Sequence, residues 1–240
     1  MKDPIDHKNL FEFYFKTNVF NDPESRSGTG SNLEQTKILR EAFPAIIRKY
    51  HIISLLDVPC GDFFWMKEIQ YKLAEILEVY IGGDIVNDII EINNQAYSKS
   101  KFSFCYMDIL KSQLPKVDLI FCRDCFVHFS YEDILRGLVN IKKSKSTFLL
   151  TTTFPGRKNK DIITGGWRPL DLQKFPFYLC EPIELFFEGC SQDNGRYMDK
   201  SIAIWKVKEV GLTKLKFLLF LLKVFRYSRL MARKARLLFH

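Results

Sequence analysis

The feature that most constrains the fold of this chain is a regular alternation of short apolar runs with longer helical or mixed segments, which begins at Ile52. Runs rich in Ile, Leu, Val and Phe between helical segments are typical of βαβ units, in which helices cover both faces of a parallel sheet. The predicted strands are residues 52–58, 78–82, 101–106, 117–122, 147–153, 185–188 and 201–207. Seven strands at this spacing predict one doubly wound α/β sheet.

Helices are predicted over residues 64–74, 89–98 and 131–143, between the first five strands. A further helix is expected to begin near Ser31 or Asn32, because Ser31 precedes Glu34 by three residues in a capping-box pattern. Pro44 is expected to kink or split this helix. We divide the chain into an aromatic N-terminal segment with a Ser-Gly-Thr-Gly-Ser loop (1–32), the sheet domain (33–210) and a tail (211–240).

The net charge of +8 is concentrated in the tail. Residues 212–240 contain eight Lys and Arg residues and no acidic residue, whereas the rest of the chain has equal numbers of basic and acidic residues. Enzymes of nucleic acids usually carry basic residues across the folded domain, so no nucleic-acid partner is expected. The apolar run 217–222 is too short to span a bilayer. We predict a basic amphipathic helix that binds a membrane surface, and docking against the body or a partner is the alternative.

The six cysteines are scattered through apolar segments, which indicates reduced thiols and no disulfide scaffold. Cys122 and Cys125 form a single CxxC pair at the end of a predicted strand, and no metal site is predicted there. The N-terminus lacks the pattern of a signal peptide. A cytoplasmic location is expected, with the tail at the cytoplasmic face of a membrane.

Polar residues follow the first four predicted strands. They are Asp57 to Asp62 after the first strand, Asp84 after the second, Asp108 after the third, and Arg123 to His128 after the fourth. A doubly wound sheet binds its ligand outside the carboxyl ends of the strands. Gly61 permits close approach of a ligand to the backbone, and an acid after the second strand is placed to accept hydrogen bonds from a ribose diol. The order and spacing of these residues predict a nucleotide-type cleft.

The ordered set Asp57…Cys60-Gly61, Asp84, Asp108 and Asp118-Leu119-Ile120-Phe121 resembles the class I S-adenosylmethionine (SAM) dependent methyltransferases over residues 33–207. The resemblance implies a Rossmann-like seven-stranded sheet with helices on both faces, and SAM as the cofactor. It implies that Asp57 and Gly61 bind the methionine part, Asp84 the ribose and Asp108 the adenine amine. The other implied cofactor contacts are Pro59, Cys60, Ile85, Ile109 and Arg123.

The first loop departs from the DxGxGxG pattern of that family because it keeps only Gly61. A pyrophosphate needs glycines where it presses on the backbone, so this loop disfavours a dinucleotide and favours SAM. A narrower resemblance rests on 57–62 together with Trp65, Arg123-Asp124, 151–155 and 167–170. These residues resemble a bacterial and viral group of methyltransferases, some of which appear in glycan biosynthesis. The implied acceptor is a sugar, a glycan or another small hydroxylated molecule.

Methyl transfer to a hydroxyl requires a base within hydrogen-bond reach. His128 and Asp124 are the candidates, since both follow the fourth strand and an imidazole titrates near neutral pH. The alternative for His128 is a structural role beside the helix start at Ser130. Arg123 is also placed to orient an acidic or hydroxylated substrate.

Residues 155–182 are too irregular for one element and too long for a turn, so they are a lid candidate. Within this segment, Trp167 is predicted to stack on a sugar and Arg168 to bind hydroxyls or a phosphate; packing of the loop on its own aromatic is the alternative. The loop 27–31 is expected either to bind an anion through backbone N–H groups or to cap a helix.

The sequence therefore predicts an enzyme that transfers the SAM methyl group to an oxygen of a sugar or small molecule. Two alternatives stay open: N-methylation of a small amine, and a non-catalytic SAM-fold module that partners a glycosyltransferase. The acceptor, metal dependence and the oligomeric state are not determined by these patterns.

Overall fold

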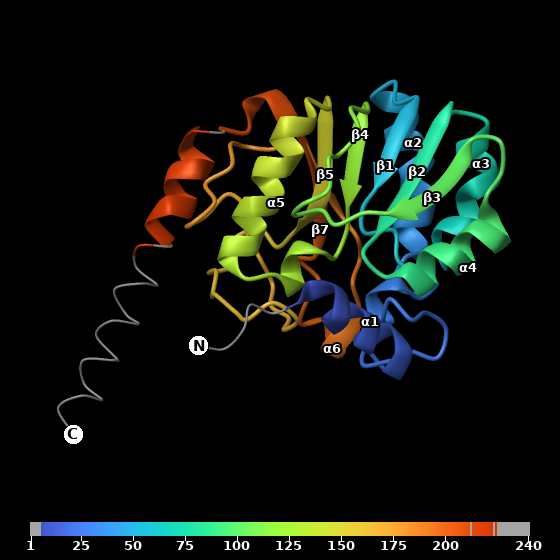
Figure 1. Cartoon of the computed structure of the whole chain (residues 1–240), viewed down its shortest axis with the longest axis horizontal. Coiled ribbons are helices and arrows are strands. Elements are labelled where there is room, and N and C mark those ends of the chain that lie inside the picture. The colour runs from blue at the N-terminus through green and yellow to red at the C-terminus, as the bar shows by residue number, and fades with distance from the viewer. Residues whose placement is uncertain (1–5, 212, 223, 225–240) are drawn as a thin grey trace.

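The computed structural model describes residues 6–211, 213–222 and 224. A single seven-stranded sheet forms its centre (Figure 1). The strands are β1 (Ser54–Asp57), β2 (Val79–Asp84), β3 (Phe102–Tyr106), β4 (Leu119–Cys122), β5 (Phe148–Thr153), β6 (Glu184–Phe187) and β7 (Ser201–Lys206). Their order in the sheet is β3-β2-β1-β4-β5-β7-β6. Strands β1 to β5 are parallel, and β7 is antiparallel to both of its neighbours. The predicted Rossmann-like sheet is confirmed, and every predicted strand overlaps an observed one.

The α-helices are α1 (His7–Thr17), α2 (Lys37–Lys49), α3 (Gln70–Ala74), α4 (Asn87–Tyr97), α5 (Tyr131–Ser144) and α6 (Gln192–Gly195). Short 3₁₀ turns cover Thr29–Ser31, Met66–Ile69, Phe126–His128 and Val207–Glu209. The predicted capping box at Ser31 is wrong, because α2 begins six residues later. Asn32 instead forms a turn, in which its side-chain oxygen accepts from the Gln35 N–H at 2.9 Å. Pro44 lies inside α2 without splitting it.

Successive residues of each strand point to opposite faces of the sheet, and each face carries its own hydrophobic cluster. Leu55 belongs to the cluster packed against α2, whereas Leu56 belongs to the cluster packed against α5. The apolar face of α2 supplies Leu39, Phe43, Ile46 and Ile47. The two-sided burial explains why these strands are almost wholly apolar in sequence.

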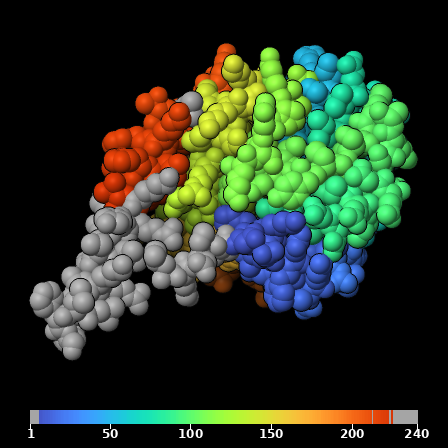
Figure 2. All heavy atoms as spheres, viewed as in Figure 1, coloured from blue at the N-terminus to red at the C-terminus, as the bar shows by residue number. Residues whose placement is uncertain are grey.

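The topology gathers the predicted site at one edge of the sheet. The chain runs outward from β1 through β2 to β3 and then returns to place β4 on the other side of β1, so the strand order reverses between β1 and β4. A cleft outside the carboxyl ends of the strands is expected at such a reversal. Helix α1 lies across these strand ends, and the space-filling view shows the N-terminal segment covering this edge (Figure 2).

Residues 213–222 of the predicted tail form a helix that packs against the body beside α5 (Figures 1 and 2). Leu215 is buried in the cluster under α5, and Leu218, Leu219 and Leu222 pack against it. The rest of the tail, from residue 225, lies outside the described residues. Within 6–211, 213–222 and 224, none of the helices is long and apolar enough to cross a bilayer.

Candidate functional site

The loop after β1 is fixed by hydrogen bonds to residues of β2. Asp57 is 4% exposed, and its carboxylate accepts from the Tyr80 hydroxyl at 2.5 Å. The Gly61 N–H donates to the Asp84 carboxylate at 3.0 Å. Gly61 has φ +55°, and a Cβ atom there would lie 2.2 Å from Ser27 Oγ. Only glycine fits this position, because a side chain would meet both backbone strain and a clash.

Three acids near the strand ends are buried. Asp57 ends β1, Asp84 ends β2, and Asp108 follows β3. Burial raises the pKa of Asp57 to about 7, against the hydrogen bond from Tyr80 that lowers it. Burial likewise raises the pKa of Asp84 to about 6. Asp108 accepts from the Leu110 N–H at 2.8 Å, which turns the chain into the next segment. A cationic ligand in the cleft would favour the ionised form of these carboxylates.

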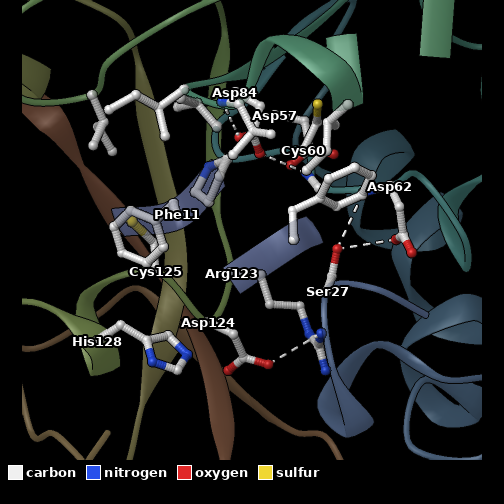
Figure 3. Close-up of a pocket in the computed structure, with 18 of the residues that line it drawn as sticks. Phe11, Ser27, Asp57, Cys60, Asp62, Asp84, Arg123, Asp124, Cys125 and His128 are labelled. Atoms are coloured by element: carbon white, nitrogen blue, oxygen red, sulfur yellow. Dashed lines mark hydrogen bonds and ion pairs between the residues drawn. The ribbon is translucent and has the colours of Figure 1, made fainter. Parts of the chain in front are cut away.

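One cleft brings these acids together and is lined by all of the predicted cofactor residues. It holds about 1150 Å³ of space that protein atoms do not fill, part of it open to solvent. The predicted residues that line it are Asp57, Pro59, Cys60, Gly61, Asp84, Ile85, Asp108, Ile109 and Arg123. The close-up shows Asp57, Asp84 and Cys60 grouped at one end, with Asp124 and His128 at the other (Figure 3).

Helix α1 forms a wall of the cleft that the sequence interpretation did not assign. Phe11, Tyr14 and Phe15 line the cleft, yet α1 has no buried residue. Three polar contacts tie the helix to the body: the Tyr14 hydroxyl donates to the Gly165 carbonyl at 3.0 Å, His7 Nε2 lies 3.3 Å from the Asp133 carboxylate, and Lys16 Nζ lies 3.4 Å from the Asp88 carboxylate. The aromatic richness of residues 8–20 was the available signal, but its target was not evident from local pattern.

Arg123 is part of the wall rather than a free cation. Its Nε and Nη2 atoms donate to the Glu188 carboxylate at 3.0 and 2.5 Å, and Nη2 also donates to the Gly30 carbonyl at 2.8 Å. Glu188 and Asp124 raise its pKa despite burial. Arg123, predicted to contact the cofactor, therefore lines the cleft with a guanidinium whose N–H donors are bound by protein groups.

Asp124 lies between the cofactor cleft and a second cavity. It has φ 51°, a left-handed conformation that L-residues seldom adopt. Its Oδ2 atom lies 2.6 Å from Lys200 Nζ and 3.2 Å from Arg123 Nη1. Burial alone would raise the pKa of Asp124, but Lys200 and Arg123 lower it to about 2. Such a carboxylate is a weak proton acceptor, so this geometry does not favour Asp124 as the base.

His128 lies beside Asp124 in the same gap between the two cavities (Figure 3). Its Nδ1 atom is 2.9 Å from the Gly166 carbonyl oxygen. A carbonyl can only accept, so Nδ1 carries the hydrogen and Nε2 presents a lone pair. Burial lowers the pKa of His128 and keeps the ring neutral at neutral pH. A neutral imidazole with Nε2 unprotonated is suited to accept a proton.

The second cavity adjoins the cofactor cleft through Phe20, Ser27, Asp124 and His128, which line both. One side carries aromatic rings: Trp167 and Tyr197 have centroids 4.8 Å apart, and Phe154 lies 6.2 Å from each. The remaining lining is polar and comprises Gly28, Thr29, Gly30, Gln35, Gln192, Asp193 and Lys200. The predicted substrate residue Trp167 therefore lies next to His128.

Arg168, predicted to contact the substrate, is bound to backbone carbonyls in the structure. It is 6% exposed, and its guanidinium donates to the carbonyls of Phe126, Val127 and Phe129 at 2.6–2.7 Å. A fourth bond, from Nε, reaches the Lys160 carbonyl at 3.2 Å. Arg168 fastens the irregular segment 155–182 to the turn before α5. We assign it a structural role because nearly all of its donors are occupied by backbone.

All six cysteines are free thiols in the structure. Cys122 and Cys125 are buried. Across the described ranges, no three His, Cys, Asp or Glu side chains are grouped as a metal site.

No protein-family model matches the sequence, and no curated protein matches it. Solved structures are similar in fold. A SAM-dependent methyltransferase from Leishmania major has a TM-score of 0.61 at 14% identity, over 82% of this chain and 83% of that one. Magnesium protoporphyrin IX methyltransferase from Synechocystis, solved with bound SAM, has a TM-score of 0.56 at 12% identity, over 86% of this chain and 99% of that one. The N-methyltransferase NodS from Bradyrhizobium japonicum, solved with S-adenosylhomocysteine (SAH), has a TM-score of 0.53 at 12% identity, over 80% and 97%. The chain has the fold of class I SAM-dependent methyltransferases.

Proposed function

We propose that this protein is a SAM-dependent methyltransferase that binds SAM in the cleft at the carboxyl ends of β1, β2 and β4. The observation that carries the proposal is the set of buried acids Asp57, Asp84 and Asp108, which line one cleft in a methyltransferase fold. The residues fit the cofactor. Gly61 permits the left-handed turn that places the loop after β1 at the cleft, Asp84 is placed to accept from ribose hydroxyls, and Asp108 to accept from an exocyclic amine.

The bound cofactor would supply a methyl group on a positively charged sulfur. For transfer to a hydroxyl, we propose that His128 Nε2 would accept the proton of the acceptor hydroxyl, whose oxygen would receive the methyl group from the bound cofactor. The Gly166 carbonyl fixes the ring by accepting from Nδ1 at 2.9 Å. Asp124, held by Lys200 and Arg123, acts as a positioning residue beside the imidazole and not as the base.

We propose that the second cavity holds the acceptor and that the acceptor is a sugar or another small hydroxylated molecule. Trp167 and Tyr197 offer ring faces and edges on which the apolar face of a sugar can pack. Gln192 and Asp193 supply amide and carboxylate groups for hydroxyls. A site with one aromatic and one polar side is matched to a ligand with one apolar and one hydroxylated face.

Calorimetric titration with SAH tests the cofactor assignment. We expect the wild-type protein to bind SAH and Asp84→Asn to bind it at least about tenfold more weakly, the loss of one charge-assisted hydrogen bond. Glu75→Gln is the control, because the Glu75 side chain is 70% exposed outside the cleft, with its carboxylate 3.9 Å from the Arg48 guanidinium. Absence of heat with the wild-type protein would remove the enzyme proposal and leave the fold alone.

The role of His128 is tested by methyl transfer from labelled SAM to glycan extracts. We expect His128→Gln to lower the rate by about 10²- to 10⁴-fold, the usual contribution of a general base, with SAH affinity unchanged. An unchanged rate would favour the alternative of N-methylation, since an amine acceptor needs no strong base. SAH binding without transfer to any extract or amine would favour the non-catalytic module.

Tryptophan fluorescence tests whether the acceptor binds in the second cavity, because one of the three tryptophans is much more exposed than the other two. Trp167 is 42% exposed, whereas Trp65 and Trp205 are 8% and 1% exposed. With SAH bound, an acceptor sugar is expected to shift or quench the emission of the wild-type protein and not that of Trp167→Phe. A signal that persists in Trp167→Phe would place the acceptor elsewhere.

We also propose that the tail helix docks the enzyme on a membrane surface. Its leucines pack on the body, which leaves Phe217 and Phe220 59% and 60% exposed beside the exposed Lys214 and Lys216. Aromatic residues flanked by cations suit an anionic lipid interface. Co-sedimentation with anionic vesicles is expected to weaken in Phe217→Ser/Phe220→Ser and not in Phe187→Ser, a 61% exposed residue of β6. Equal pelleting of all three proteins would exclude this surface.

A further inference from the structure

The charged residues that line the cofactor cleft are mostly acidic. Five carboxylates line it: Asp57, Asp62, Asp84, Asp108 and Asp124. They suit the sulfonium and the ammonium group of SAM, but they oppose its carboxylate. Because SAM carries all three groups, a cationic side chain beside its carboxylate would offset this repulsion.

The basic side chains of the cleft can be sorted by their partners. They are His7, Arg26, Arg123 and His128. Arg123 is bound by Glu188 and Gly30, His7 lies against Asp133, and His128 is held by Gly166. Arg26 is exposed, and among the described residues its guanidinium makes no ion pair and no hydrogen bond. Of the basic groups in this cleft, the Arg26 guanidinium alone is left free to pair with a ligand.

Asp62 fixes the backbone position of Arg26. The Arg26 N–H donates to the Asp62 carboxylate at 2.7 Å, and the hydroxyls of Ser25 and Ser27 donate to the same carboxylate at 3.0 Å. Figure 3 shows the Ser27 contact at the edge of the cleft. Ser27 also packs against Gly61, the glycine of the loop after β1. Arg26 is thereby anchored beside the loop that is assigned to the methionine part of SAM.

Hydrogen bonds at the loop 27–31 occupy several of the backbone N–H groups that could otherwise bind an anion. The Ser27 N–H donates to Ser25 Oγ at 3.1 Å, the Gly28 N–H to the Ser25 carbonyl at 3.1 Å, and the Ser31 N–H to the Gly28 carbonyl at 2.8 Å. These N–H groups hold the loop together and do not offer a cradle for an anion. These three N–H groups are already used, and the Arg26 guanidinium is the charged donor at this loop that lines the cleft.

We propose that Arg26 binds the carboxylate of the methionine part of SAM and so determines specificity for the complete cofactor; the proposal rests on the proposed function. A guanidinium binds a carboxylate through two parallel N–H donors, which gives both affinity and orientation. Fixing the methionine part also orients the methyl group toward the gap that contains His128 and Asp124. Arg26 acts on binding and positioning and touches no reacting atom.

The test compares two ligands and four proteins by titration calorimetry. The ligands are SAH and decarboxylated SAH, which differ in the carboxylate only. The proteins are wild type, Arg26→Gln, Arg26→Lys and the control Arg48→Gln. Arg48 lies on α2 outside the cleft, with its guanidinium 3.9 Å from Glu75. We expect Arg26→Gln to lower the affinity for SAH by about tenfold, the effect of losing one charge-assisted pair. The affinity for decarboxylated SAH should be unchanged. Arg26→Lys should recover part of the loss, and Arg48→Gln should match the wild type.

Each outcome decides between the proposals. If Arg26→Gln weakens both ligands equally, or weakens neither, the carboxylate assignment is overturned while SAM binding stands. If wild type binds neither ligand, the proposed function fails together with this assignment. Thermal unfolding of Arg26→Gln identifies a folding defect, and the binding of decarboxylated SAH reports directly that the cleft is intact.

Discussion

At the residue scale, the site depends on carboxylates whose protonation is set by burial. Asp57, with a pKa raised to about 7, holds a proton in the ligand-free protein at pH values where an exposed Asp is ionised. A cationic ligand favours the ionised form, so binding of SAM or SAH must release this proton.

The affinity for SAH is therefore expected to depend on pH. As the pH falls through about 7, protonation of Asp57 competes with the ammonium group, and SAH should bind on the order of tenfold more weakly near pH 6 than near pH 8. Titration calorimetry across this range measures the effect. Asp57→Asn should bind SAH weakly at both pH values. Its affinity should also change less with pH, because the remaining pH dependence then comes from Asp84, whose pKa is about 6. An unchanged slope in Asp57→Asn would contradict this explanation.

The residues of the site divide into those that a local pattern identifies and those that it does not. Asp57, Gly61, Asp84 and Asp108 were predicted because each follows a strand, and all of them line the cleft. Arg168 was assigned to substrate because an arginine in a loop suggests an anion. Its true partners are backbone carbonyls about 40 residues earlier in the chain. A sequence pattern carries no information about partners at that separation.

At the element scale, α1 forms a wall of the proposed cofactor cleft. It contributes aromatic rings to the cleft, but none of its residues is buried and few polar contacts hold it. Elements with little buried apolar surface open at low free-energy cost. Entry and release of a cofactor are expected to involve this helix.

Two phenylalanines of α1 provide a matched test of that expectation. Phe11 faces the cleft and packs against Phe129, with ring centroids 6.1 Å apart, whereas Phe13 is 57% exposed on the other side of the helix. Phe11→Ala is expected to increase the SAH dissociation rate several-fold, because it removes about 1 kcal/mol of apolar contact. Phe13→Ala should leave the rate unchanged in a stopped-flow displacement experiment. Equal effects of both variants would indicate a general loss of helix stability.

At the scale of the whole molecule, a buried ion network joins the cofactor side of the sheet to its antiparallel edge. Arg123, at the end of β4, pairs with Glu188 after β6, and Lys200 before β7 pairs with Asp124. Lys200 Nζ also lies 3.5 Å from Glu188. Two cations and two anions thus compensate one another in the interior. Removing one of them leaves a charge buried without its partner.

Glu188→Ala is accordingly expected to destabilise the protein by about 3 kcal/mol, because it leaves Arg123 and Lys200 with a single shared anion. Glu184→Ala is the control on the same strand segment. Its side chain is 30% exposed and pairs at the surface with Lys49 at 2.6 Å, so we expect a cost of at most about 1 kcal/mol. Urea unfolding measures both free energies. A similar cost for the two variants would show that the buried network contributes no more than a surface pair.

The sequence by itself determined the class of fold and the position of the cofactor cleft. Alternating apolar runs, a glycine at a tight turn and acids at strand ends are properties of neighbouring residues, and they were sufficient to predict seven strands and their functional edge. Only the packing of distant segments shows that α1 covers the cleft, that β7 runs antiparallel, and that Arg123 and Arg168 are bound by the protein while the Arg26 guanidinium has no partner among the described residues. These outcomes depend on contacts between residues far apart in the chain, and such contacts are settled by the packing of the folded molecule.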